Sequence, residues 1–102
     1  MAMPYGWILT EDHCGGTYKD RMRLVGTPAE KIDLELRLKA GEGVQFRLFD
    51  SDGGLDYVGR IIVPPGEEGG ELWFAPLDWA KRDTGSTEVR YLNADNGKWE
   101  VL

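Results

Sequence analysis

The chain has 102 residues, of which 41% are hydrophobic and 29% are charged, a composition typical of one globular domain with one core. The net charge of −6 disfavours direct binding to nucleic acid. A single cysteine excludes an intrachain disulfide and a cysteine-rich zinc site. No apolar run reaches the roughly 20 residues of a membrane helix, and the amino terminus lacks a signal-peptide pattern. We therefore expect a cytoplasmic protein that does not contact a membrane.

The excess of acidic residues is concentrated in the middle of the chain. Residues 42–78 contain eight acidic side chains against Arg47 and Arg60, whereas the segments on either side have equal numbers of acids and bases. A concentrated negative patch favours a basic partner, although solubility alone is the simpler explanation.

Two strands are predicted near the amino terminus. Residues 5–11, "YGWILTE", have apolar side chains at both alternating sets of positions, which suits a largely buried strand. Residues 21–26, "RMRLVG", alternate more weakly and predict a second, short strand. The segment between them is rich in glycine and polar residues and predicts a loop.

Residues 27–43 fit two different structures. Thr27, Pro28 and Glu30 match the start of a helix, with a capping box and proline at the first helical position. Against this, apolar residues alternate strictly with charged ones from 32 to 39, and a helix would place these apolar side chains on two opposed sides. We favour a strand, because a strand can bury all of its apolar side chains on one face.

The next segment predicts a β-hairpin around Asp52 and Gly53. A two-residue turn at this position makes one face of the hairpin apolar and the other mostly polar. The predicted facing pairs are Asp50 with Leu55, Leu48 with Tyr57, Phe46 with Gly59, Val44 with Ile61 and Phe49 with Asp56. A strand at 27–43 would add Leu36 opposite Phe46 and complete a three-stranded meander.

The remaining elements are predicted from turn signals. Pro64 and Pro65 end a strand, residues 71–75 predict another strand, and residues 76–83 a short helix led by proline. "STEVRYL" and "KWEVL" form a last hairpin around "NADNG". The fold class is therefore mainly β, with α+β as an alternative: residues 1–102 form one domain with an antiparallel sheet of about six strands and one or two short helices.

The motifs that could carry chemistry are weak. "DSDGGLD", residues 50–56, begins like a calcium loop, but the sixth and twelfth places hold Leu55 and Ile61 in place of the required glycine and glutamate. His13 and Cys14 are adjacent, so in an extended chain they point in opposite directions and form neither a metal site nor a base and nucleophile pair. We expect no enzymatic activity, no metal and no cofactor, with a calcium or small-molecule module as a less favoured alternative.

The four tryptophans divide into two groups. Trp7, Trp73 and Trp99 lie on predicted strands and are expected in the core. Trp79 lies in the polar segment "LDWAKRD", where a fixed, exposed ring would be a good anchor for a partner.

Several blocks resemble a group of small uncharacterised bacterial proteins that are also found on phages and plasmids. The blocks are "GWILTED", "FRLFDSDG", "YVGR", "FAPLDW", "GSTEVRYL" and "GKWEVL". The chain departs from the group at Ser51, which interrupts the acidic turn, at "WAKRDTGS", and in an expanded segment 27–43. The resemblance implies a mobile-element context, but it implies no activity and no catalytic residue.

These observations lead to two hypotheses about function. The first is a small acidic inhibitor or modulator, of the anti-CRISPR or anti-defence type, that occludes a basic surface on a larger protein, such as a surface that binds nucleic acid. The second is a structural or self-associating β domain, so that the chain is a monomer or a homodimer. The residues expected at the partner surface under the first hypothesis are Asp50, Asp52, Asp56, Glu67, Glu68, Glu71 and Trp79.

Overall fold

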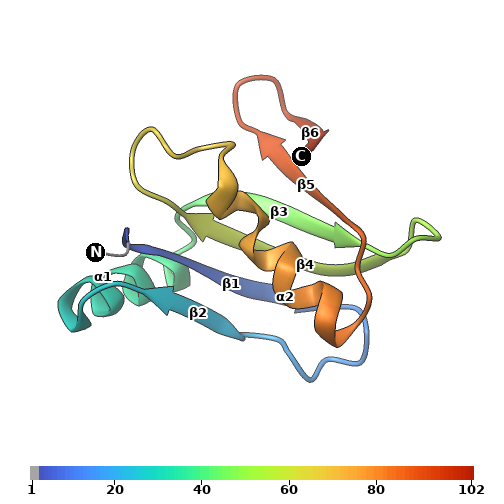
Figure 1. Cartoon of the computed structure of the whole chain (residues 1–102), viewed down its shortest axis with the longest axis horizontal. Coiled ribbons are helices and arrows are strands. Elements are labelled where there is room, and N and C mark those ends of the chain that lie inside the picture. The colour runs from blue at the N-terminus through green and yellow to red at the C-terminus, as the bar shows by residue number, and fades with distance from the viewer. Residues whose placement is uncertain (1–2) are drawn as a thin grey trace.

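The computed structural model describes residues 3–102, at position 83 for the backbone alone. Its centre is a six-stranded antiparallel sheet in the order β2-β1-β4-β3-β5-β6 (Figure 1). The elements are β1 (Tyr5–Asp12), β2 (Met22–Val25), α1 (Pro28–Lys39), β3 (Val44–Phe49), β4 (Leu55–Ile62), the short 3₁₀ helix η1 (Glu71–Phe74), α2 (Ala75–Asp83), β5 (Glu88–Asn93) and β6 (Lys98–Val101). The predicted class, a mainly antiparallel β fold of six strands with short helices, is confirmed.

Residues 28–39 form helix α1, so the predicted strand is wrong. The Thr27 hydroxyl accepts a hydrogen bond from the Glu30 N–H, and the Glu30 carboxylate accepts one from the Thr27 N–H at 2.8 Å. The apolar residues do fall on two sides of the helix: Leu34 and Leu38 are buried, whereas Ile32 and Leu36 are each 65% exposed. The predicted meander is wrong as well, because both neighbours of β3 in the sheet are other strands, β4 and β5.

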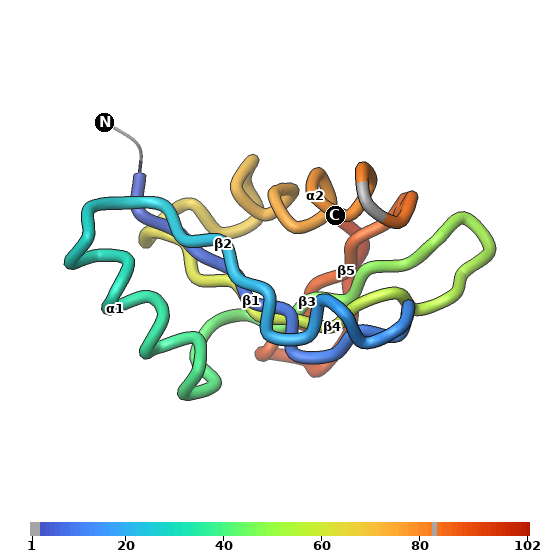
Figure 2. Tube along the Cα trace, turned by 90° about the horizontal axis from the view of Figure 1, so that it is seen from below, coloured from blue at the N-terminus to red at the C-terminus, as the bar shows by residue number. Residues whose placement is uncertain are grey.

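The two helices lie on opposite faces of the sheet (Figure 2). The larger core fills the space between the sheet and α2, and a smaller core lies between the sheet and α1. The larger core is built from Trp7, Leu9, Phe46, Leu48, Tyr57, Ile61, Leu77, Ala80, Val89 and Tyr91, and the smaller one from Ile8, Leu34, Leu38 and Ile62.

The hairpin of β3 and β4 has the predicted register except at its tip. Leu48 faces Tyr57, Phe46 faces Gly59 and Val44 faces Ile61, as predicted. Near the turn the register shifts by one residue, so that Phe49 faces Leu55 and Asp56 becomes the extra residue of a β-bulge. The physical reason is the carboxylate of Asp50, which accepts hydrogen bonds of 2.8 Å from the backbone N–H groups of Asp52 and Gly54 and closes a longer turn.

The glycine at position 59 is required by the packing of β4 between its neighbours. A Cβ atom at Gly59 would collide with the ring of Phe46 and with the carbonyl oxygen of Ile8. The absence of a side chain therefore lets the Phe46 ring lie across β4 inside the larger core.

Residues 71–74 form the 3₁₀ helix η1 and not the predicted strand. The ring of Trp73 stacks on Tyr91 with centroids 4.1 Å apart, and the Tyr91 hydroxyl donates a 2.6 Å hydrogen bond to the Trp73 carbonyl. These contacts hold the segment over the sheet instead of in it. The predicted helix that follows is confirmed as α2, and the last hairpin is confirmed as β5 and β6.

Candidate interaction surface

Half of one sheet face carries no helix. Helix α1 packs mainly on β1, β2 and β4, and α2 lies on the other face of the sheet (Figure 2). Alternate residues of a strand share a face. The register therefore places every second side chain of β3, β5 and β6 on the uncovered half. We call this surface the open sheet face, and it consists of Gln45, Arg47, Phe49, Glu88, Arg90, Leu92, Trp99 and Val101.

Two arginines of the open sheet face stack on aromatic rings. The guanidinium carbon of Arg47 lies 4.0 Å from the ring centroid of Trp99, and that of Arg90 lies 4.5 Å from the centroid of Phe49. Such cation–π contacts contribute about 0.5–1 kcal/mol each at exposed sites. They also restrict the arginine side chains, so that two planar cations occupy defined positions on the surface.

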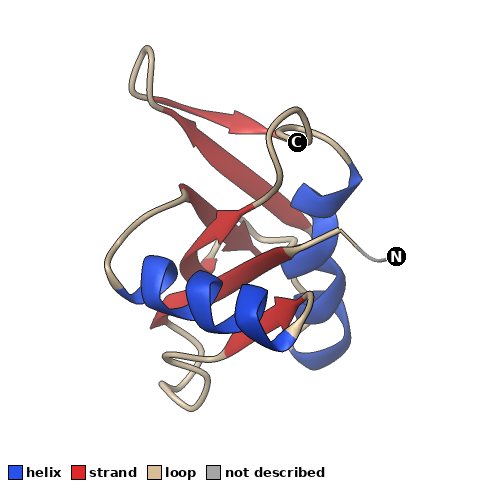
Figure 3. Cartoon of the chain, turned by 90° about the vertical axis from the view of Figure 1, so that its left-hand side faces the viewer, coloured by secondary structure: helices blue, strands red, loops and turns tan. Residues whose placement is uncertain are grey.

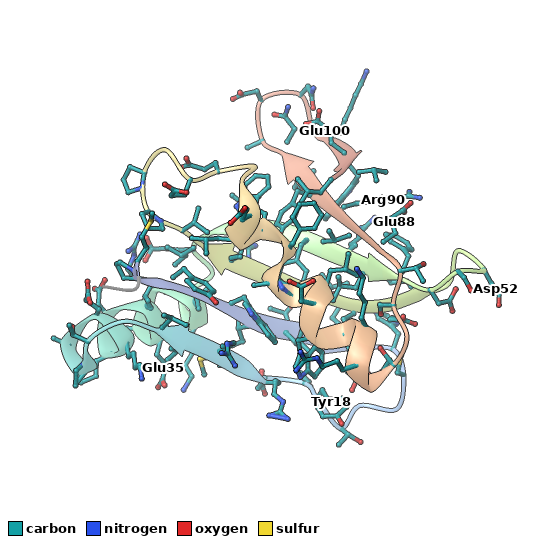
Figure 4. The ribbon with its side chains drawn as sticks, viewed as in Figure 1. Tyr18, Glu35, Asp52, Glu88, Arg90 and Glu100 are labelled. Atoms are coloured by element: carbon teal, nitrogen blue, oxygen red, sulfur yellow. The ribbon has the colours of Figure 1, made fainter. Side chains whose placement is uncertain are left out.

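The charges on this surface are not balanced. Arg47 and Arg90 are directly opposite each other on neighbouring strands, an arrangement that is unfavourable for like charges. Arg90 pairs with Glu88 (Figure 4), but no carboxylate of the described part of the chain lies within 4.0 Å of Arg47. The Nε atom of Arg47 is buried without a hydrogen-bond partner. An acidic protein therefore presents a local, uncompensated positive charge.

A cleft adjoins the open sheet face where β5 separates from β3. The two strands pair only from Phe46 opposite Tyr91 to Phe49 opposite Glu88, and β5 and β6 then diverge from the other strands (Figure 3). The resulting cleft has a volume of about 620 Å³, within the range of ligand pockets. Its lining includes Gln45, Leu92 and Val101 of the open sheet face, so the cleft adjoins one edge of that face.

The acidic residues predicted at the partner surface do not lie together. Asp50 and Asp52 are at the tip of the β3–β4 hairpin, whereas Glu67, Glu68 and Glu71 follow the far end of β4 (Figures 1 and 4). The eight residues of β4 separate the two groups by about 26 Å at 3.3 Å per residue. A contact that includes both groups would have to span the length of β4.

Asp56 lies inside the protein, so its predicted role at the partner surface is wrong. Only 7% of the residue is exposed, because the bulge directs its carboxylate to the end of α2. There Asp56 accepts a 2.6 Å hydrogen bond from the Ser86 hydroxyl and a 3.3 Å hydrogen bond from the Cys14 thiol. These contacts give Asp56 a structural role.

The structure reverses the expected roles of two tryptophans. Trp79 is half-buried in an aromatic cluster, with ring centroids 5.5 Å from Trp7, 5.4 Å from Tyr57 and 5.1 Å from Tyr18. It anchors α2 to the sheet and is not a free ring. Trp99, predicted in the core, is also half-buried, but it lies on the open sheet face against the guanidinium group of Arg47.

Sequence reasoning missed Arg47, Arg90 and Trp99 as a group. The available signal was that Arg47 and Arg90 occupy the polar sides of their predicted strands, whereas Trp99 shares a side with Val101 and gave no such signal. That signal identifies a shared surface only when the order of the strands is known, because the three residues come from three strands.

The two residues that suggested chemistry have inert surroundings. The His13 Nε2 lies 3.0 Å from an exposed Glu11 carboxylate. Desolvation of the Cys14 sulfur, with the hydrogen bond and charge of Asp56, raises the pKa of this thiol to about 11, so it is protonated and weakly nucleophilic at neutral pH. Within residues 3–102, apart from the side chain at 83, no group of three or more His, Cys, Asp or Glu side chains is placed to hold a metal ion.

Comparison of the chain with protein-family models, with curated proteins and with solved structures gives no match. In the described part of the chain, none of the helices has the length and apolar character to cross a membrane. The class defined by the observations above is a small, mainly antiparallel β protein whose distinctive feature is the open sheet face.

Proposed function

We propose that this chain is a small acidic, non-enzymatic binding protein that inhibits or modulates a larger protein by occluding its surface. The observation that supports this proposal best is the open sheet face, half of a sheet surface left without a covering helix. The resemblance to phage and plasmid proteins adds a mobile-element context, in which an anti-CRISPR or other anti-defence inhibitor is the expected type. Such a protein would act in the cytoplasm of the host cell.

The composition of the open sheet face suits a protein partner. Arginine and tryptophan are enriched among the residues that dominate binding energy, and here Arg47 and Trp99 are stacked on each other. Leu92 and Val101 add apolar surface beside them, with Val101 61% exposed. Because the strands already hold these side chains in place, little conformational entropy would be lost on binding.

The acidic hairpin tip would extend the contact at one end. Asp50 and Asp52 continue β3 beyond the open sheet face, where they would approach basic groups at the rim of the partner. Rim charges of this kind affect the association rate and its salt dependence more than the affinity. The proposed partner is therefore a larger protein with a basic area, such as one that binds nucleic acid.

A matched pair of surface variants tests the proposal. Val101 and Ile32 are both exposed aliphatic residues, at 61% and 65%, but Val101 lies on the open sheet face and Ile32 on α1. The partner is captured from a lysate of the native host, purified, and titrated with each variant by calorimetry. We expect Val101→Lys to weaken binding at least tenfold and Ile32→Lys to change it less than twofold.

Two results would contradict the proposal. Equal affinities for both variants would place the contact outside the open sheet face. Loss of binding with Ile32→Lys alone would show that the partner contacts α1.

A self-associating β domain is the second candidate function, and the edge strand β6 favours it. Strand β6 has one neighbour in the sheet, β5, so its other edge can pair with a copy of the same chain. Light scattering over a range of concentrations distinguishes the two candidates, because a strict monomer excludes pairing of this kind.

A further inference from the structure

We infer that the partner contacts the open sheet face through a carboxylate that pairs with the guanidinium group of Arg47. The inference rests on the proposed function and specifies its chemistry: the partner is a protein whose contact surface is acidic and apolar at its centre, opposite Arg47.

The first argument is that Arg47, unlike Arg90 on the neighbouring strand, has no carboxylate partner among the described side chains. Arg90 pairs with Glu88, and an Arg60 N–H donates a 3.2 Å hydrogen bond to the Gly43 carbonyl. For Arg47, the side chains of residues 3–102, excluding residue 83, supply a ring but no carboxylate within 4.0 Å.

The second argument is the direct opposition of Arg47 and Arg90 across neighbouring strands. Glu88 neutralises one of the two cations, so the pair keeps one net positive charge. A carboxylate placed beside Arg47 would neutralise this remaining positive charge.

The third argument is that the guanidinium group of Arg47 is already positioned. Its stack on Trp99 restricts the side chain, and a planar guanidinium can bind a carboxylate through two parallel hydrogen bonds. Leu92 and Val101 lie on the same surface, so a partner that covers them would exclude water and strengthen the ion pair.

The charge distribution favours a protein carboxylate over a nucleic acid phosphate. Only Arg47 and Arg60 in this region have no carboxylate within 4.0 Å among the described side chains, which suits one or two anionic groups, whereas a nucleic acid strand presents a row of charges. A nucleic acid strand bound along β3 would meet the carboxylates of Asp50 and Asp52 just beyond the end of β3. The protein as a whole also has a net charge of −6. Both features would repel a polyanion.

The test uses three probes and the side-chain N–H signals of the arginines in ¹⁵N NMR spectra. The probes are a five-residue peptide alternating leucine and glutamate, the same peptide with glutamine in place of glutamate, and a ten-nucleotide oligothymidylate. We expect the Arg47 Nε–H signal to shift and saturate with the glutamate peptide, and the glutamine peptide to bind at least tenfold more weakly.

Three variants complete the test. Arg47→Gln should abolish the response, and Arg47→Lys, which keeps the charge but loses the planar fork, should reduce affinity at least fivefold. Arg82→Gln removes the same charge from α2, on the other face of the sheet, and should change affinity less than twofold. The melting temperature of each variant confirms that it is folded.

Several results would overturn the inference. Equal binding of the two peptides would exclude a role for the carboxylate. An equal loss of affinity in Arg47→Gln and Arg82→Gln would show that the peptide responds to the net charge of the protein and not to Arg47. A shift of the Arg47 signal with the oligonucleotide, without one from the glutamate peptide, would assign the site to nucleic acid. If the purified partner is lost with Val101→Lys but retained with Arg47→Gln, the proposed function stands and this inference fails.

Discussion

The buried Ser86 hydroxyl donates a 2.6 Å hydrogen bond to a carboxylate oxygen of Asp56, 30 residues away in the chain. This contact joins the segment after α2 to the bulge of β4. It exists because the longer turn around Asp50 shifts the register and directs the Asp56 carboxylate inward. A residue of an apparent metal loop thereby becomes part of the packing between α2 and the sheet.

Removing the Ser86 hydroxyl should destabilise the protein. Ser86→Ala leaves a buried carboxylate without its shortest hydrogen bond, and we expect the free energy of unfolding to fall by about 1–3 kcal/mol. Thr87→Ala, at an exposed neighbour, should stay within about 0.5 kcal/mol of the parent. Urea denaturation measures both values, and similar losses for the two variants would contradict a structural role for the Ser86–Asp56 contact.

The Cys14 thiol should lose its proton only at high pH and should influence the stability of the protein at alkaline pH. Its pKa rises from 9.0 to about 11 on folding, so the folded state binds the thiol proton more tightly than the unfolded state. The associated stability is fully present below about pH 9 and is lost as the pH rises toward 11.

Two measurements check this prediction for Cys14. Alkylation by iodoacetamide should be slow at pH 8 in the folded protein and fast in urea. The melting temperature of Cys14→Ala should decline less between pH 9 and 11 than that of the parent. Tyr57, whose pKa is raised to about 12 by burial, contributes to the decline in both proteins. Identical slopes for the two proteins would contradict the role of Cys14.

The two tryptophans with reversed roles should differ strongly in stability tests. Trp79→Ala removes a ring that packs on Trp7, Tyr18 and Tyr57, and we expect a loss of about 3–5 kcal/mol. Trp99→Ala removes chiefly the stack with Arg47, a loss of about 1 kcal/mol. Chemical denaturation of both variants tests this order, and a larger loss for Trp99→Ala would contradict the assigned positions.

Leu34 and Leu36 provide a direct test of helix α1. In the strand first favoured from the sequence, both side chains would lie on one face and respond alike. In the helix Leu34 is 4% exposed and Leu36 is 65% exposed, so Leu34→Ala should lose about 2–5 kcal/mol and Leu36→Ala less than about 0.5 kcal/mol. Thermal unfolding measures both, and equal losses would argue against the helix.

Local patterns predicted the hairpins well and the segment 27–43 wrongly. The facing pairs of β3 and β4 follow from alternation and a nearby turn, so short-range information is sufficient for most of the register. In α1 the capping box indicated the correct structure, whereas the strict alternation was misleading because Ile32 and Leu36 remain exposed. An alternating pattern predicts a strand only if all of its apolar residues are to be buried together.

The candidate site could not be predicted because it depends on contacts between distant segments. Arg47 lies 52 positions before Trp99 in the sequence, and their stack requires β5 to lie between β3 and β6. The acidic cluster from 42 to 78 looked continuous in the sequence, but β4 carries its two halves to opposite ends of the molecule.

The sequence by itself determined the features that arise from neighbouring residues: the class of fold, the positions of the hairpins, the capped start at Thr27 and most of the register between β3 and β4. Only the tertiary structure decided which faces are covered. The burial of Asp56, the position of Trp79 between α2 and the sheet, and the position of Trp99 and Arg47 on the open sheet face depend on where α1 and α2 pack and on the order of the strands. The physical reason is that hydrogen bonds in turns and caps involve residues close in the chain, whereas burial of a side chain depends on segments that folding brings to it.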